Sequence, residues 1–239
     1  MKQRDTRSAD SPNIYLSGEY SDRHPGWHAE DSDWKADQIM KMMGRNHISP
    51  KSVSEVGCGA GEILRNLQKR LPDTCVLDGY DISPQAIRLC EGKKNANLRF
   101  FREDFFSTDT TYDVSLAIDV IEHVEDYLDF LRKLKGRGDL KILHVPLDLH
   151  AQGLLRNALG PTWDRLGHLH FFTRDTVFRS LNHCGYQIID WFYTNQATGL
   201  RPKRFSARIA KLPRMIATIM SEEFAVRALG GFSLMILAR

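Results

Sequence analysis

The stretch VSEVGCGAGE, Val53 to Glu62, decides what fold to expect of this chain. Its first four residues form a short segment typical of a buried strand, and glycines follow at positions 57, 59 and 61. Apolar residues then recur at helical spacing until Pro72, namely Ile63, Leu64, Leu67 and Leu71. Glycines without side chains let a ligand approach the loop backbone and the amino end of the helix. The stretch predicts a strand, a glycine loop and a helix in succession.

Short apolar segments alternate with helix-like segments along the rest of the chain. Further strands are expected at 75–80, 98–101, 112–118, 140–145, 187–193 and 233–238. Helices are expected from Ser83 to Leu89, from Val124 to Leu134, and after Thr173 up to Gly185. This alternation is typical of a parallel sheet covered on both faces. It predicts an α/β fold with a seven-stranded, mostly parallel sheet.

The remaining segments are interpreted as decorations of one domain. A chain of 239 residues often forms a single α/β domain. Residues 1–13 are expected to be a flexible tail, and 14–239 the domain. Within it, 14–50 is expected to form an N-terminal helical cap that begins at Asp33, and 194–231 a helical insertion before the last strand.

Charge and cysteine usage limit the partners and the compartment. Lys plus Arg number 33 and Asp plus Glu 30, so the net charge of +3 gives no reason to expect nucleic acid as a partner. The four cysteines are widely spaced and fit reduced thiols. No secretion signal and no apolar run of membrane-spanning length is found. A cytoplasmic protein is therefore expected, and its oligomeric state is left open.

A carboxylate accompanies the glycine loop. Asp81 lies twenty residues after Gly61, at the end of the next expected strand, where it can accept from ribose hydroxyls. Together they indicate an adenosine-type cofactor. Nicotinamide dinucleotides share this geometry, but Glu62 in the first helical turn would repel a pyrophosphate, and the glycine spacing is GxGxG instead of GxGxxG.

With these features the sequence resembles the class I S-adenosylmethionine-dependent methyltransferases. Four segments carry the resemblance: VSEVGCGAG, YDIS around Asp81, EDFF from Glu103 to Phe106, and YDVSLAIDVIEHVED from Tyr112 to Asp126. The resemblance implies a Rossmann-like fold and S-adenosylmethionine as the cofactor. The implied cofactor-binding residues are Glu55, Gly57, Gly59, Gly61, Asp81 at the ribose, Ile82, Asp104 and Phe105 at the adenine, and Asp119.

The acceptor side needs close alignment and, for a hydroxyl acceptor, a base that removes its proton. His123, just after the fourth expected strand, is the first candidate base. His170 in GHLHFFT, Gly167 to Thr173, is the second, and His144 and His150 are weaker candidates. A packing or solvent-facing role is the alternative for each histidine.

The fourth segment most resembles the small-molecule branch of the family, which includes the O-methyltransferases of ubiquinone biosynthesis. Relatives there can hold a divalent metal on an acidic residue followed three positions later by Glu-His, and Asp119, Glu122 and His123 match this pattern. Such residues also occur at strand ends without metal, so no metal site is assigned. The Asp/Asn-Pro-Pro-aromatic motif of the amino-methylating nucleic-acid branch is absent.

The resemblance implies O-methylation of a small-molecule, glycan-linked or lipid-linked acceptor. A catalytically silent S-adenosylmethionine-binding module and, less favoured, a nicotinamide-dependent oxidoreductase are the alternatives. In the cap, Trp27, Trp34 and Lys35 either close the pocket, with Lys35 near the methionyl carboxylate, or serve packing and solvation. The basic segment 201–214 fits a lid, a dimer surface or, through 201–220, a peripheral membrane contact.

Overall fold

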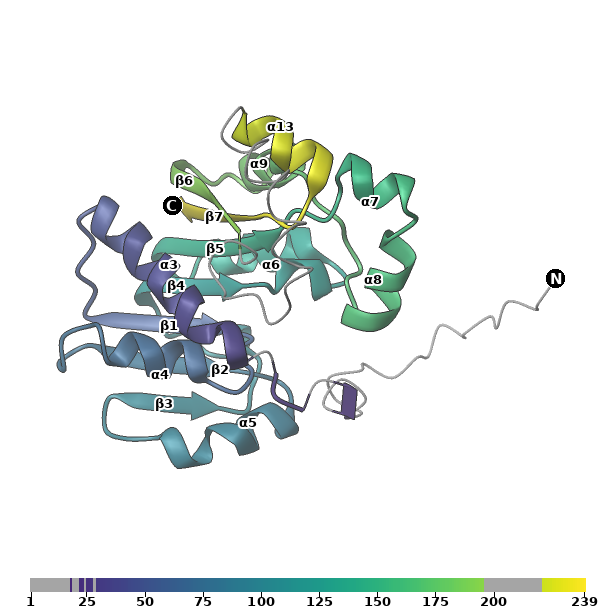
Figure 1. Ribbon diagram of the computed structural model, residues 1–239. Helices are drawn as coiled ribbons and strands as arrows, with labels where there is room; N and C mark the ends of the chain where they lie inside the picture. The colour runs from purple at the N-terminus through teal and green to yellow at the C-terminus, as the bar shows by residue number, and fades with distance from the viewer. Residues whose placement is uncertain (1–17, 19–21, 24, 28, 196–220) are drawn as a thin grey trace.

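A seven-stranded sheet runs through the centre of the computed structural model, which describes residues 18, 22–23, 25–27, 29–195 and 221–239 (Figure 1). The strand order is β3-β2-β1-β4-β5-β7-β6. The strands are β1 (Ser52–Val56), β2 (Val76–Tyr80), β3 (Leu98–Phe101), β4 (Tyr112–Ile118), β5 (Gly138–Pro146), β6 (Ile188–Thr194) and β7 (Ser233–Ala238). Neighbours from β3 to β5 are parallel, whereas β7 is antiparallel to β5 and β6. The predicted α/β class and mostly parallel sheet are confirmed.

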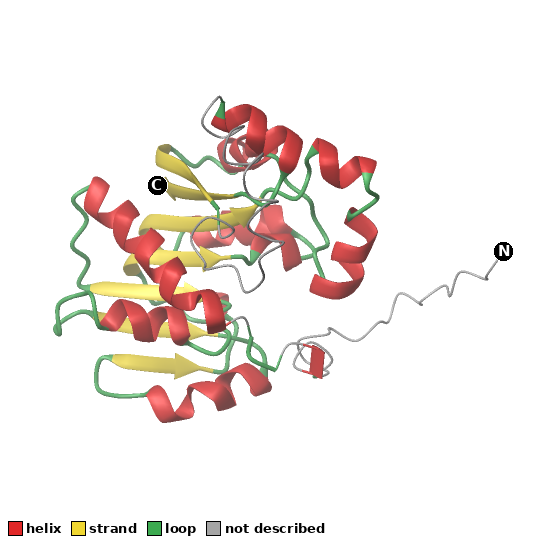
Figure 2. Ribbon diagram, viewed as in Figure 1, coloured by secondary structure: helices red, strands yellow, loops and turns green. Residues whose placement is uncertain are grey.

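Helices cover both faces of the sheet (Figure 2). One face packs against α3 (Ser32–Arg45), α4 (Glu62–Gln68) and α5 (Pro84–Cys90), and the other against α6 (Tyr127–Lys135), α9 (Arg174–His183) and α13 (Glu222–Leu229). Successive residues of a strand point to opposite faces, so Leu116 of β4 joins the first core and Ala117 the second. The sheet therefore separates two apolar cores.

Local capping explains where several helices begin. The Ser83 side chain accepts from the Ala86 amide with Pro84 at the first helical position, as expected. Helix α6 begins at Tyr127 and not at Val124, because the Asp126 side chain accepts from the Asp129 amide. Residues Ile121–His123 before it form the short 3₁₀ helix η4.

The N-terminal cap helix also begins earlier than expected. Helix α3 starts at Ser32, preceded by the 3₁₀ helix η1 (Ala29–Asp31). Asp33 was the expected cap, but it bonds to Arg70 at 2.7 Å. Asp31, which precedes the helix, pairs with Lys35 one turn later at 3.2 Å.

Four further short helical elements, in addition to η1 and η4, were not predicted. Helices α7 (Ala151–Leu155) and α8 (Leu159–Leu166) fill the connection after β5, and the His150 ring accepts from the Gly153 amide to cap α7. The 3₁₀ helices η2 (Glu91–Lys93) and η3 (Phe105–Ser107) follow α5 and β3.

Some predicted segments lie outside the described residues. These are the tail 1–13, the basic segment 201–214 and most of the insertion 194–231, of which α13 is described. Among the helices that the structure describes, none combines the length and the apolar character needed to cross a bilayer.

The parallel strands place their following loops at one edge of the sheet. Strands β1, β2, β4 and β5 share a direction, and β6 shares it too because both β5 and β6 are antiparallel to β7. Their carboxyl ends lead to the glycine loop, Asp81, Asp119 and Thr194. Ligands of open α/β sheets bind at this edge.

A methyl group at Gly61 is expected to destabilise the fold. Gly61 has a φ of +73°, and a Cβ there would lie 2.5 Å from Cε1 of Phe100. We expect Gly61→Ala to lower the free energy of unfolding by about 1–3 kcal/mol in urea denaturation. Gly92→Ala is the matched control, since its Cβ would meet nothing within 4 Å. Equal losses in the two variants would contradict the crowding at Gly61.

Candidate active site

The glycine loop turns back over the end of β2. The amides of Gly57 and Cys58 donate to the Tyr80 carbonyl at 2.8 and 3.0 Å. A Cβ on Gly57 would lie 3.1 Å from Val120, just after β4, and one on Gly59 would lie 3.4 Å from the Trp27 ring. Both glycines have positive φ, a conformation that strains any side chain, and at Gly57 the neighbouring Val120 also leaves little space. The loop is enclosed between the end of β4 and the N-terminal cap.

Asp81 is bonded to the glycine loop, so the structure brings together the two features that the sequence paired. Its Oδ2 accepts from the Gly59 amide at 2.9 Å, and its Oδ1 accepts from the Ser83 amide at 2.8 Å. Burial raises the pKa of Asp81, although both amides oppose the shift. Each carboxylate oxygen has a second lone pair, so Asp81 can accept further hydrogen bonds from a ligand.

Glu55 is a buried carboxylate near the loop. Its side chain is 1% exposed, and its Oε2 has no hydrogen-bond partner among the described residues. Burial raises the pKa of Glu55 well above its ordinary value, and attraction to Lys35 opposes the shift only in part. A ligand that donates a hydrogen bond or carries a positive charge would supply the missing partner.

The expected adenine-side residues differ in their exposure. The Asp104 carboxylate is exposed and accepts from the Phe106 amide at 3.0 Å, which starts η3. Phe105 is 1% exposed and packs edge-on against Tyr80 with ring centroids 5.0 Å apart. Ile82 is 40% exposed at the same edge. Phe105 therefore lies in the core, whereas Asp104 and Ile82 are accessible to a ligand.

A chain of charges and hydrogen bonds runs beneath α3. Lys35 contacts Asp119 at 2.8 Å, and the other Asp119 oxygen lies 2.6 Å from Nδ1 of His144. Burial tends to raise the pKa of Asp119, but attraction to His144 and Lys35 lowers it well below its ordinary value. Asp119 has a φ of +54°. Sequence reasoning proposed neither this pairing of Lys35 nor the bond of His144, because the residues are far apart along the chain.

A second cluster lies after β4 and includes a residue that the sequence pattern missed. One candidate ligand atom from each of Glu122, His123 and His168 lies within 4.8 Å of the others. Asp148 Oδ2 lies 2.6 Å from Nδ1 of His168. This geometry leaves Nε2 of His168 as the ligand nitrogen, with Asp148 as the outer carboxylate that orients such rings.

These three residues could hold a divalent metal, and the set differs from the one implied by resemblance. The Asp119 carboxylate is already paired with Lys35 and His144, so it is not among the candidate ligands. His168 is the third candidate ligand in its place. Neither carboxylate oxygen of Glu122 has a hydrogen-bond partner among the described residues, and the side chain is 1% exposed. Burial raises the pKa of Glu122 well above its ordinary value, and repulsion from Asp119 adds to the shift. A bound cation would relieve both effects.

The two candidate bases lie in different surroundings. His123 Nδ1 lies 3.1 Å from the Gly167 carbonyl, and its ring packs edge-on against His168 at 4.8 Å. His170 Nε2 lies 3.0 Å from the Val124 carbonyl, and its ring lies 4.7 Å from that of Tyr127. Because a carbonyl only accepts, both nitrogens are the protonated ones. The loop 167–170 is held at this edge by the Leu169 amide, which donates to the Glu122 carbonyl at 2.7 Å.

A family model described as a methyltransferase domain matches residues 27–190, more than half of the chain. The chain belongs to the methyltransferase domain family. The matched range contains the glycine loop, Asp81, Asp119 and both candidate bases. The predicted membership of the methyltransferases is confirmed.

Curated relatives match part of the methyltransferase domain. Ubiquinone biosynthesis O-methyltransferase of Rickettsia bellii is 28% identical over 94 residues, which cover 38% of this chain and 39% of that protein. The mitochondrial enzyme of the same name from Schizosaccharomyces pombe is 31% identical over 120 residues, covering 45% and 43%. The matches thus span less than half the length of these relatives.

Solved structures share the fold of the methyltransferase domain. Magnesium protoporphyrin IX methyltransferase of Synechocystis PCC 6803 with bound SAM has a TM-score of 0.60 at 14% identity, covering 97% of this chain and 99% of that one. A SAM-dependent methyltransferase of Archaeoglobus fulgidus has a TM-score of 0.55 at 18% identity, covering 85% and 93%. At these identities the likeness establishes the fold.

Replacing the buried Glu55 carboxylate is expected to stabilise the protein. Because its folded-state pKa is raised, the folded chain holds the proton more tightly than the unfolded chain, and stability is lost as the pH rises above the ordinary glutamate pKa. Glu55→Gln should therefore be more stable than wild type near neutral pH, by about 1–3 kcal/mol in urea denaturation. The difference should shrink when the pH is lowered toward the ordinary glutamate pKa.

The control for this measurement is Glu91→Gln, which changes an exposed carboxylate in the same way. Its stability should follow that of wild type at both pH values. A Glu55→Gln variant less stable than wild type near neutral pH would show that the carboxylate has a partner in the folded protein.

The metal-binding ability of the second cluster can be measured without any acceptor. We expect Asp148→Asn to lower the affinity for Zn²⁺ about 10–100-fold, because the variant no longer orients the His168 ring. Titration against a competing chromophoric chelator gives the affinity. His183→Ala, which removes an exposed histidine of α9, should leave it unchanged. Equal affinities of wild type and Asp148→Asn would contradict the role of Asp148 in orienting His168 for the metal.

Proposed function

We propose that the chain transfers a methyl group from S-adenosylmethionine to an oxygen of a small-molecule acceptor, free or linked to a glycan or lipid. The observation that carries this proposal is the glycine loop bonded to Asp81 beside the buried carboxylate of Glu55, in a methyltransferase domain. The relatives named ubiquinone biosynthesis O-methyltransferase and the fold-sharing structure with bound SAM support it.

The residues at the carboxyl edge fit S-adenosylmethionine. Its methionyl ammonium is the donor that Glu55 lacks, and its ribose hydroxyls can donate to the Asp81 carboxylate. The exposed Asp104 and Ile82 suit the adenine amine and ring. The Lys35 ammonium has three N–H donors, and its pairs with Asp31 and Asp119 use two of them. The third can donate to the methionyl carboxylate.

The chain's own residues align the acceptor and remove its proton in this proposal. S-adenosylmethionine supplies, when bound, an electrophilic methyl group on a sulfonium. Since the Nδ1 proton of His123 points to the Gly167 carbonyl, the lone pair of the neutral ring is on Nε2, which can take a proton or bind a metal. His170, whose Nε2 donates to backbone carbonyls, would act through Nδ1 and is the second candidate base.

Other readings of the same site are less well supported. The Glu62 carboxylate at the start of α4, held by Lys93 at 2.9 Å, would repel the pyrophosphate of a nicotinamide dinucleotide. We also propose a cytoplasmic location, because all four cysteines are free and buried. The modest net charge of +3 favours a small acceptor over a nucleic acid.

Asp81 is expected to control cofactor affinity. Asp81→Ala removes a ribose acceptor and the bond that holds the Gly59 amide, so its affinity for S-adenosylhomocysteine should fall at least about tenfold in calorimetry. Asp109→Ala, which truncates a fully exposed aspartate, should bind as wild type does. Wild-type protein should show no comparable affinity for NAD. Equal binding by wild type and Asp81→Ala, with both folded by circular dichroism, would remove Asp81 from the site.

A further inference from the structure

The α7–α8 segment, residues 151–166, presents large apolar side chains to solvent. Leu154 and Leu155 at the end of α7 are 56% and 89% exposed, and Trp163 of α8 is 48% exposed. Both helices are fully described, and Gly153 is their only buried residue. Figure 1 shows α7 and α8 at the right of the view, outside the sheet. The segment is therefore a surface element, and the proposed reaction uses none of these apolar side chains.

The apolar face of α8 is only partly covered by the rest of the protein. Helical spacing places Leu159, Trp163 and Leu166 on one face of this helix. Leu159 and Leu166 are half-buried, and Trp163 remains about half exposed. Single apolar residues on a surface are common, but several close together along one short segment are typical of an interaction surface.

Positive charges accompany the apolar side chains. Arg156, at the end of α7, is exposed and takes part in no ion pair among the described residues. Arg165 is exposed in the last turn of α8, and the Arg23 guanidinium donates to the Asp164 carbonyl at 2.8 Å. Asp164 is the only acidic residue of the segment. The surface is therefore both apolar and basic.

This combination fits an anionic lipid bilayer better than a protein partner. A stable protein interface buries about 800 Å² on each side, which is more than two leucines and a tryptophan offer. In a two-fold dimer of this chain, the same arginines would face each other. A bilayer instead takes up apolar side chains beneath its headgroups, its anionic lipids attract arginines, and tryptophan favours the boundary between lipid and water.

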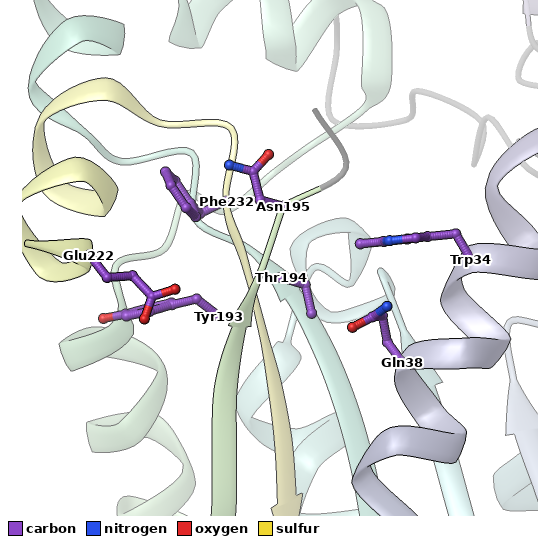
Figure 3. Close-up of a pocket in the computed structure, with 7 residues that line it drawn as sticks. All are labelled: Trp34, Gln38, Tyr193, Thr194, Asn195, Glu222 and Phe232. Atoms are coloured by element: carbon purple, nitrogen blue, oxygen red, sulfur yellow. The ribbon is translucent and has the colours of Figure 1, made fainter. Parts of the chain in front are cut away.

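Both ends of the segment are joined to the candidate active site. Before α7, the Leu147 amide donates to the Phe232 carbonyl at 2.9 Å. Phe232 is one of the residues that line a pocket of about 240 Å³ near the end of β6 (Figure 3). After α8, the Gly167 carbonyl lies 3.1 Å from Nδ1 of His123, the first candidate base. A bilayer bound at the segment would therefore lie beside the candidate site.

We propose that the α7–α8 segment binds the surface of an anionic lipid bilayer, with Leu154, Leu155 and Trp163 among the lipids and Arg156 against their headgroups. This membrane binding goes beyond methyl transfer, since it requires neither the cofactor nor an acceptor. It brings the pocket and the loop of the candidate bases to the bilayer, where a lipid-linked acceptor can reach them. Only this last consequence rests on the proposed function.

The test measures co-sedimentation of the full chain with vesicles of phosphatidylcholine, with and without phosphatidylglycerol. Wild-type protein should bind the anionic vesicles more tightly, and added salt should weaken this binding. Leu155→Ser should lower the partition coefficient at least about tenfold, because one leucine side chain no longer leaves water. Leu89→Ser, which changes an exposed leucine of α5 in the same way, should bind as wild type does.

Two further variants test the charge and the position of the segment. Arg156→Gln should weaken binding to the anionic vesicles about fivefold and leave binding to pure phosphatidylcholine unchanged. Arg88→Gln, at an exposed arginine of α5, is the matched control. Lipids with brominated acyl chains should quench the tryptophan fluorescence of bound wild-type protein. In Trp163→Phe this quenching should be largely lost although the protein still binds.

Several outcomes would overturn the proposal. The first is wild-type protein that binds no vesicles. The second is binding that persists unchanged in folded Leu155→Ser and Arg156→Gln, which would place the contact elsewhere in the chain. The third is a dimer in analytical ultracentrifugation that dissociates in Leu155→Ser, without vesicle binding, which would assign the leucines to a second copy. Protein that binds vesicles but no S-adenosylhomocysteine contradicts the proposed function and supports the membrane surface.

Discussion

The carboxylate of Asp119 joins elements that are distant in the sequence. Its two oxygens contact Lys35 of α3 and His144 of β5, and His144 in turn bonds to Thr194 of β6. A buried charge is stable only with such partners, and they also compensate for the φ of +54° at Asp119, a conformation that costs about 1–3 kcal/mol at a residue other than glycine. This one side chain therefore ties the N-terminal cap helix to two strands at the carboxyl edge of the sheet.

Glu55 and Glu122 are buried carboxylates that, unlike Asp119, are not fully paired with other described residues. Both are almost completely buried, and each has at least one carboxylate oxygen without a hydrogen-bond partner among the described residues. Burial raises the pKa of both, which weakens the folded state at neutral pH. Asp119 repels Glu122, and its partner Lys35 attracts Glu55, whereas the charge of Asp119 itself is satisfied by Lys35 and His144. Unsatisfied carboxylates beside a satisfied one are typical of a site that is completed by a ligand.

Much of the fold could be predicted because the signals that determine it act between residues close together in the sequence. The glycine loop, the Ser83 cap and the alternation of apolar segments act within a few residues, and the structure has the expected strands within two residues at each end. The predicted start of α6 at Val124 was wrong, because the Asp126 cap competes with the apolar pattern and starts the helix at Tyr127. The approach of His168 to Glu122 and His123 could not be predicted, since it depends on how the connection after β5 folds back.

The parts of the candidate site that follow from neighbouring strand ends could also be predicted from the sequence. Asp81 lies against the loop because the ends of adjacent parallel strands must meet. Phe105 shows the limit, since an aromatic side chain after a strand fits a ligand pocket and a core equally well, and only the packing on Tyr80 distinguishes them. The roles of these residues in binding and catalysis stay predictions. The same holds for the basic segment 201–214, which lies outside the described residues.

The position of β7 sets the order in which the molecule can be completed. The last strand along the chain is inserted between β5 and β6, and in the described sheet β6 pairs only with β7. During synthesis the edge of β5 therefore stays uncovered until β7 has been made, and β6 has no neighbour in the described sheet before then. Such late, long-range pairing slows folding and exposes the chain to aggregation. The sheet can extend past β5 only after both β6 and β7 have been synthesised.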